Sequence, residues 1–274
     1  MTPPEFDPPF EIVQPDRLAG PLMYNSPHSG AVFPPSFLAQ SQLDVPALRQ
    51  SSDLFVDDLI LDSVRLGVPV MRAHFPRSFL DVNREPYELD PRMFEGDLPV
   101  GANTRSLRVS SGYGTVARLV AESQAIYPVR IPVEEALRRI DSYYLPYHAT
   151  LGQALSSLRR IHGRAVLVDW HSMPSGAVPS GRQIDIVLGD RHGTSCSSAL
   201  TRQAERLFQS LGFTVARNQP YAGGFITEHY GTPSAGIEVL QVEINRALYM
   251  HEARQERSGG FSLLREALSL VTEG

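Results

Sequence analysis

Two histidines and one glutamate lie near the ends of three separate apolar runs. His28 ends the run PLMYNSPHSG, His171 follows residues 165–168, and Glu243 lies near the end of IEVLQVEINR. Imidazole nitrogens and carboxylate oxygens are the ligands that zinc uses in hydrolytic sites. A carboxylate that is not a ligand can accept a proton from water as a general base. The three residues together therefore suggest a metal site with a base, although each alone is better explained as a hydrogen-bonded polar residue at a strand end.

The segment LVDWHSMP, residues 167–174, carries the clearest part of this pattern. Side chains alternate along a strand, so Asp169 and His171 point the same way. Open α/β sheets usually build their sites at the carboxyl ends of parallel strands. Asp169 is therefore placed to orient His171 by a hydrogen bond if His171 binds a metal.

A third metal ligand is sought among the acidic residues of SSDLFVDD, which are Asp53, Asp57 and Asp58. Asp53 follows Ser51 and Ser52 near an expected helix start, where it could equally be a simple helix N-cap, so the choice among the three carboxylates stays open at this point.

The segment RSFLDVNRE, residues 77–85, holds groups that suit a substrate carboxylate. Asn83 offers an amide, and Arg84 and Arg77 offer guanidinium groups, which bind carboxylates through paired hydrogen bonds. Arg105, in the segment TRS, is a further candidate. The alternative is that these are surface residues in a polar turn.

Composition limits the classes of function. The chain has 274 residues, of which 42% are hydrophobic and 20% charged, and its formal net charge is −5. This charge argues against nucleic acid or an anionic membrane as a partner. The chain contains no lysine, which excludes a lysine Schiff base, a P-loop lysine and a lysine nucleophile. Its one cysteine, Cys196, permits no internal disulfide and is expected to have a structural role. No apolar run approaches the ~20 residues of a membrane span, and the proline-rich, acidic start does not resemble a signal peptide, so we expect a cytoplasmic protein.

Apolar periodicity predicts strands alternating with helices, and therefore an α/β fold with a mixed, mostly parallel sheet flanked by helices. We expect one domain over residues 1–274, with residues 1–20 as an N-terminal arm. The strands are expected at 21–28, 68–75, 165–170 and 184–189, and in FTVAR and IEVLQVEI. The helices are expected over at least the second half of 46–66 and at 132–162, 197–211 and 259–272, with Pro146 interrupting the second. The long polar stretch 76–115 is expected to be functional.

Seven motifs, in order, resemble those of the N-formylglutamate amidohydrolase family over roughly residues 20–255: NSPHSG, SSDLFVDDL, FPRSFLDVNREP, VDWHSMPS, LGDRHGTS, PYAGGFITEHYG and VEINRALYM. The resemblance implies a zinc-carboxypeptidase-like (phosphorylase/hydrolase-like) fold, shared with the aspartoacylase and succinylglutamate desuccinylase deacylases. In those relatives a strand-end histidine begins a His-x-x-Glu ligand pair, whereas the fourth position here is Ala31. Asp53 is therefore the predicted replacement ligand.

The resemblance implies a hydrolase of a linear amide that converts N-formyl-L-glutamate to formate and L-glutamate, in the context of histidine degradation. It implies a divalent metal, zinc being favoured, that activates water, with Glu243 as general base. The predicted metal ligands are His28, Asp53 and His171, and the predicted substrate contacts are Asn83, Arg84, Arg77 and Arg105. The expected partner is a small acidic N-acyl amino acid. The alternatives are a deacylase or carboxypeptidase of another N-acyl amino acid or peptidoglycan fragment, and a catalytically silent ligand-binding relative.

The dipeptide Gly223-Gly224 in PYAGG has two interpretations. It either lets the backbone approach a substrate closely or forms a tight turn.

Overall fold

The computed structural model describes residues 5–178 and 183–274, so residues 1–4 of the predicted arm lie outside the described residues. The chain forms two compact units. The sheet unit comprises residues 12–26, 53–72 and 152–274, and the loop-rich unit comprises residues 5–11, 27–52 and 73–151. Within the described ranges, no helix combines the length and apolar composition needed to cross a membrane.

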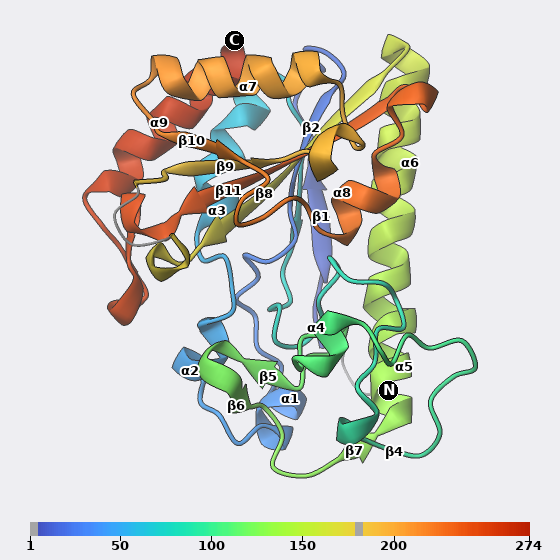
Figure 1. Cartoon of the computed structure of the whole chain (residues 1–274). Coiled ribbons are helices and arrows are strands. Elements are labelled where there is room, and N and C mark those ends of the chain that lie inside the picture. The colour runs from blue at the N-terminus through green and yellow to red at the C-terminus, as the bar shows by residue number, and fades with distance from the viewer. Residues whose placement is uncertain (1–4, 179–182) are drawn as a thin grey trace. The chain divides into compact units, whose positions relative to one another are not determined.

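A seven-stranded sheet has the strand order β1-β3-β2-β8-β11-β9-β10 (Figure 1). Its strands are β1 (Phe10–Val13), β2 (Leu22–Ser26), β3 (Val70–Ala73), β8 (Ala165–Met173), β9 (Ile186–Gly189), β10 (Val215–Arg217) and β11 (Ile237–Asn245). The pairs β2–β3, β2–β8, β8–β11 and β9–β10 are parallel, whereas β9 and β11 are antiparallel. The prediction of a mixed, mostly parallel sheet in an α/β fold is confirmed.

Helices of the sheet unit flank this sheet (Figure 1). They are α3 (Val56–Ile60), α7 (Ser198–Ser210), α8 (Phe225–Tyr230) and α9 (Gly260–Glu273). Contacts join α7 to α9 and α3 to α9, while α8 packs against β11. The Ser197 hydroxyl caps α7 by accepting from the Leu200 N–H, as expected of a serine at that position.

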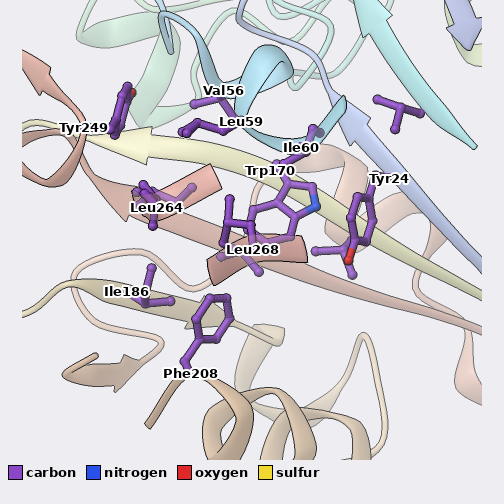
Figure 2. Close-up of a cluster of buried hydrophobic side chains, with 14 of the residues drawn as sticks. Tyr24, Val56, Leu59, Ile60, Trp170, Ile186, Phe208, Tyr249, Leu264 and Leu268 are labelled. Atoms are coloured by element: carbon purple, nitrogen blue, oxygen red, sulfur yellow. The ribbon is translucent and has the colours of Figure 1, made fainter. Parts of the chain in front are cut away.

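The main apolar cluster of the sheet unit packs on one face of the sheet, to which alternate residues such as Val168 and Trp170 of β8 and Leu240 and Val242 of β11 point. Trp170 lies at its centre, surrounded by apolar side chains from β9, α3, α7 and α9 (Figure 2). Cys196 belongs to this core, and burial raises the pKa of its thiol to about 11, which agrees with the predicted structural role.

The loop-rich unit is organised around a buried arginine. The Arg139 guanidinium carbon lies 4.2 Å from the ring centre of Phe79, and its Nη1 donates to the Tyr127 hydroxyl over 2.8 Å. Its Nε donates to Glu135 Oε1 over 2.8 Å, so the buried charge is paired.

The loop-rich unit contains short helices and two short strand pairs. Its helices are α1 (Pro35–Gln40), α2 (Val45–Arg49), α4 (Leu107–Ser110) and α5 (Val133–Arg139). Its strand pairs are β4 (Phe94–Glu95) with β7 (Ile131–Pro132) and β5 (Leu119–Val120) with β6 (Gln124–Ala125). Helix α6 (Leu145–His162) continues into the sheet unit.

Three predicted elements differ from the structure. The predicted arm contains β1, a four-residue strand too short to give a periodic pattern. The helix predicted for at least the second half of 46–66 is formed by α3 and a following 3₁₀ segment, and Phe55, left-handed with φ 66°, separates it from α2. The predicted helix 132–162 contains a π-helical turn, Ile140–Tyr144, which ends two residues before Pro146.

We expect Phe208→Ala to lower the free energy of unfolding by about 3–5 kcal/mol, because it removes a fully buried ring and leaves a cavity in the core. Urea unfolding measures this change. Leu263→Ala, at a position that is 70% exposed on α9, is the matched control and should change stability by less than about 0.5 kcal/mol. Equal effects of the two substitutions would contradict the placement of the core.

Candidate metal centre and active site

The face of the sheet opposite the core carries a row of buried polar side chains. In the parallel register, Asn25 of β2 pairs with Asp169 of β8, and Gln241 and Glu243 of β11 pair with Asp169 and His171. Because side chains alternate along a strand, these five residues share one face. The prediction that the side chains of Asp169 and His171 point to the same side of the strand is therefore confirmed. Glu243 lies beside His171 in the strand pairing.

His171 lies between two carboxylates. Its Nε2 is 2.8 Å from Asp169 Oδ2, and its Nδ1 is 3.0 Å from Asp53 Oδ2. Asp169 is itself fixed, because Asn25 Nδ2 donates to its Oδ1 over 2.7 Å. All four residues are buried. Asp169 thus has the orienting contact with His171 that the sequence suggests.

Two buried carboxylates control the protonation of this imidazole. Burial alone would lower the pKa of His171, but the charge of Asp169 and the hydrogen bonds to Asp169 and Asp53 raise the pKa well above its usual value. A protonated imidazole donates from both nitrogens, which matches the two carboxylate contacts. A metal ion at Nδ1 would replace one of these protons.

Asp53 is not a helix N-cap. Phe55 occupies the N-cap position of α3, and no side chain caps that helix end. Ser172 Oγ and Arg246 Nη2 each donate to Asp53 Oδ1 over 3.2 Å, which leaves Oδ2 facing His171. The left-handed Phe55, whose ring packs on Arg257 and Phe261, turns the chain two residues after Asp53.

The donor set of Asp53 and His171 fits a divalent metal. The two facing atoms, Oδ2 and Nδ1, are 3.0 Å apart. Two ligands of tetrahedral zinc, with bonds of about 2.0–2.1 Å, lie roughly 3.3 Å apart, so small movements would admit the ion. The contact of Asp169 with Nε2 is the outer contact that metal-binding histidines usually make.

The loop-rich unit positions His28 in a similar way. Its Nε2 is 2.8 Å from Asp81 Oδ1, and both residues are buried. Arg77 Nε donates to Asp81 Oδ2 over 2.9 Å, and the Asn83 N–H donates to Asp81 Oδ1 over 2.8 Å. Although burial would raise the pKa of Asp81, the charges of Arg77, Arg84 and His28 hold it well below its usual value. Asp81 is therefore a charged anchor for the predicted ligand His28.

Arg84 is held rigidly in the same unit. Its Nε donates to the Tyr113 carbonyl over 2.9 Å, and its Nη1 donates to the Asn83 carbonyl over 2.8 Å. Tyr144, on the π-helical turn, donates its hydroxyl to the Arg84 carbonyl over 2.6 Å. Burial lowers the pKa of Arg84 to about 10, so it remains a cation at neutral pH.

Four further candidates remain, which are Arg105, Asp57, Asp58 and Gly223. Arg105 is exposed, just before α4. Asp57 pairs with Arg72 and Asp58 with Arg257, so Asp53 is the acidic residue of its segment that contacts His171. The Gly223 backbone lies against Gly189, where a Cβ would come within 2.8 Å of the Gly223 nitrogen.

Sequence reasoning missed three residues of this arrangement: Asp81, Gln241 and Arg246. Asp81 and Arg246 lie within the quoted motifs FLDVNRE and VEINR. Gln241 shares the period-two spacing of Glu243, so the alternation that singled out Asp169 also applies to it. Their roles depend on contacts with residues distant in sequence.

Comparisons with known proteins agree with the motifs. The family model for N-formylglutamate amidohydrolase matches residues 20–250. Proteins named N-formylglutamate deformylase from Pseudomonas aeruginosa and Pseudomonas putida are each 27% identical, covering 88% and 85% of this chain and 86% and 82% of their own lengths. A crystal structure of N-formylglutamate amidohydrolase from Ralstonia eutropha JMP134 is 37% identical with a TM-score of 0.91, covering 96% of this chain and 95% of that chain. The predicted family is confirmed: the chain belongs to the N-formylglutamate amidohydrolase family, whose members are hydrolases of a linear amide.

Proposed function

We propose that this protein hydrolyses N-formyl-L-glutamate to formate and L-glutamate at a divalent metal site. The observation that carries the proposal is His171, a buried imidazole with carboxylates 2.8 and 3.0 Å from its two nitrogens. Membership of the family and relatives named for this substrate support the choice of reaction.

The proposed metal ligands are His28, Asp53 and His171, whose side chains are all of metal-binding types. In both histidines a carboxylate engages Nε2, which favours coordination through Nδ1.

The proposed reaction uses a base and a clamp supplied by the protein. A bound divalent metal would supply Lewis acidity and lower the pKa of water, and zinc suits this donor set. Glu243 accepts the proton of the attacking water and returns it to the leaving amine. Arg84 and Asn83, with Arg77 beside them, bind a carboxylate of the substrate, for which the planar guanidinium of Arg84 is well suited.

We expect the wild-type protein to release formate from N-formyl-L-glutamate, and Glu243→Gln to lower kcat by about 10²- to 10⁴-fold, because an amide cannot act as a base. Formate is measured by a coupled assay. N-acetyl and N-succinyl glutamate are the controls: preferred turnover of either would favour a different deacylase, and turnover of none would favour a ligand-binding relative.

Metal binding has its own test. His171→Ala and Asp53→Ala should each weaken zinc binding, measured by competition with a chelator, by more than about 100-fold, since each loses a ligand. Asp58→Ala, which removes a carboxylate paired with Arg257, is the matched control and should bind zinc normally. Unchanged affinity in both ligand variants would remove Asp53 and His171 from the site.

Arg84→Lys should raise KM for N-formyl-L-glutamate by about 10-fold or more, because lysine keeps the positive charge but cannot donate two parallel hydrogen bonds to a carboxylate. Arg138→Lys, at a partly exposed ion pair of the same unit, is the control and should leave KM unchanged. Arg105→Lys in the same assay tests the other predicted arginine. A normal KM in Arg84→Lys would contradict the proposed clamp.

A further inference from the structure

We infer that Gln241 is a positioning residue for Glu243, held in place by the loop at residues 220–224, which Gly189 allows to lie directly on the sheet. The inference rests on the proposed function, because it assumes that Glu243 is the base. It assigns a role to three features that the reaction outlined above leaves unused: a buried glutamine, a glycine in a strand and the PYAGG loop.

Gln241 contacts Glu243 along one face of β11. Its Nε2 donates to Glu243 Oε1 over 2.9 Å, and both side chains are buried, at 4% and 7% exposure. A buried hydrogen bond to a carboxylate is stronger than one between neutral groups. The contact restricts the rotation of the Glu243 side chain and occupies Oε1 with a donor.

The orientation of the Gln241 amide follows from its second partner. The Gly224 N–H lies 2.7 Å from Gln241 Oε1, and the Thr227 hydroxyl lies 3.4 Å from the same atom. A backbone N–H can only donate, so the amide atom that faces Gly224 must be the oxygen. The amide nitrogen therefore faces Glu243 and can only donate to it.

Gly189 explains why the loop can reach Gln241. Gly189 of β9 pairs with Gln241 in the sheet. A Cβ on Gly189 would lie 2.8 Å from both the Ala222 carbonyl carbon and the Gly223 nitrogen, closer than real Cβ contacts. Any side chain at this position would displace the loop backbone, and with it the Gly224 N–H. One line of contacts thus runs from Gly189 through the loop backbone at Gly224 to Gln241 and then to Glu243.

Steady-state kinetics test this line of contacts. Gln241→Met keeps the side-chain volume but loses both hydrogen bonds, and we expect kcat to fall by about 10- to 100-fold with KM changed by less than about 3-fold. Gly189→Ala should have a similar effect on kcat. The double variant should be no worse than the poorer single variant, because both substitutions break the same line. Gly152→Ala, in α6 with its nearest atom 3.7 Å away, is the control and should retain normal kcat.

The outcomes separate the inference from the proposed function. An active wild type, an inactive Glu243→Gln variant and a Gln241→Met variant with normal kcat would overturn the inference alone. A wild type that releases no formate, or a fully active Glu243→Gln variant, would overturn the proposed function and this inference with it. If Gly189→Ala fails to fold, the Gln241→Met variant still tests the inference. Its zinc content and thermal unfolding midpoint show whether a lower kcat comes from a correctly folded protein.

Discussion

The burial of charged groups on one face of a sheet is the constraint on which the rest of the site depends. Asp169, His171 and Glu243 are all buried, and a charged side chain without a partner in such a place costs several kcal/mol. Each therefore has a fixed partner: Asn25 for Asp169, two carboxylates for His171 and Gln241 for Glu243. The need for partners turns a row of polar residues into a rigid arrangement.

The alternation of β8 and β11 allows the same strands to build both the core and the site. Trp170 and Val242 face the apolar core, while their neighbours His171 and Glu243 face the opposite side. A shift of one residue in the pairing of either strand would place charges in the core. The packing around Trp170 therefore fixes the register of the chemical groups.

Much of this organisation can be predicted from the sequence. Strong periodicity identifies the long strands and helices, and the Asp169–His171 spacing follows from geometry alone. The break at Phe55 is not predictable, because a left-handed conformation at a bulky residue depends on its packing against Arg257 and Phe261.

The roles of individual polar residues are harder to predict than their presence. Asp53 is compatible with a helix cap in sequence, and only its contacts with His171 and Arg246 distinguish the two roles. Asp81 acts through its hydrogen bond with His28. Gln241 accepts from the backbone N–H of Gly224, in a loop that precedes it in the sequence. Such contacts leave no fixed spacing in a single sequence.

We propose that the Asp53 carboxylate and the His171 imidazole, which face one another, hold a metal ion. The most direct measurement is anomalous diffraction, at the zinc edge, from crystals grown with zinc. We expect a single strong peak within coordination distance of His171 Nδ1 and Asp53 Oδ2, with His28 as the third protein ligand. A peak bound by other residues, or an intact Asp53–His171 hydrogen bond in fully zinc-loaded protein, would contradict it.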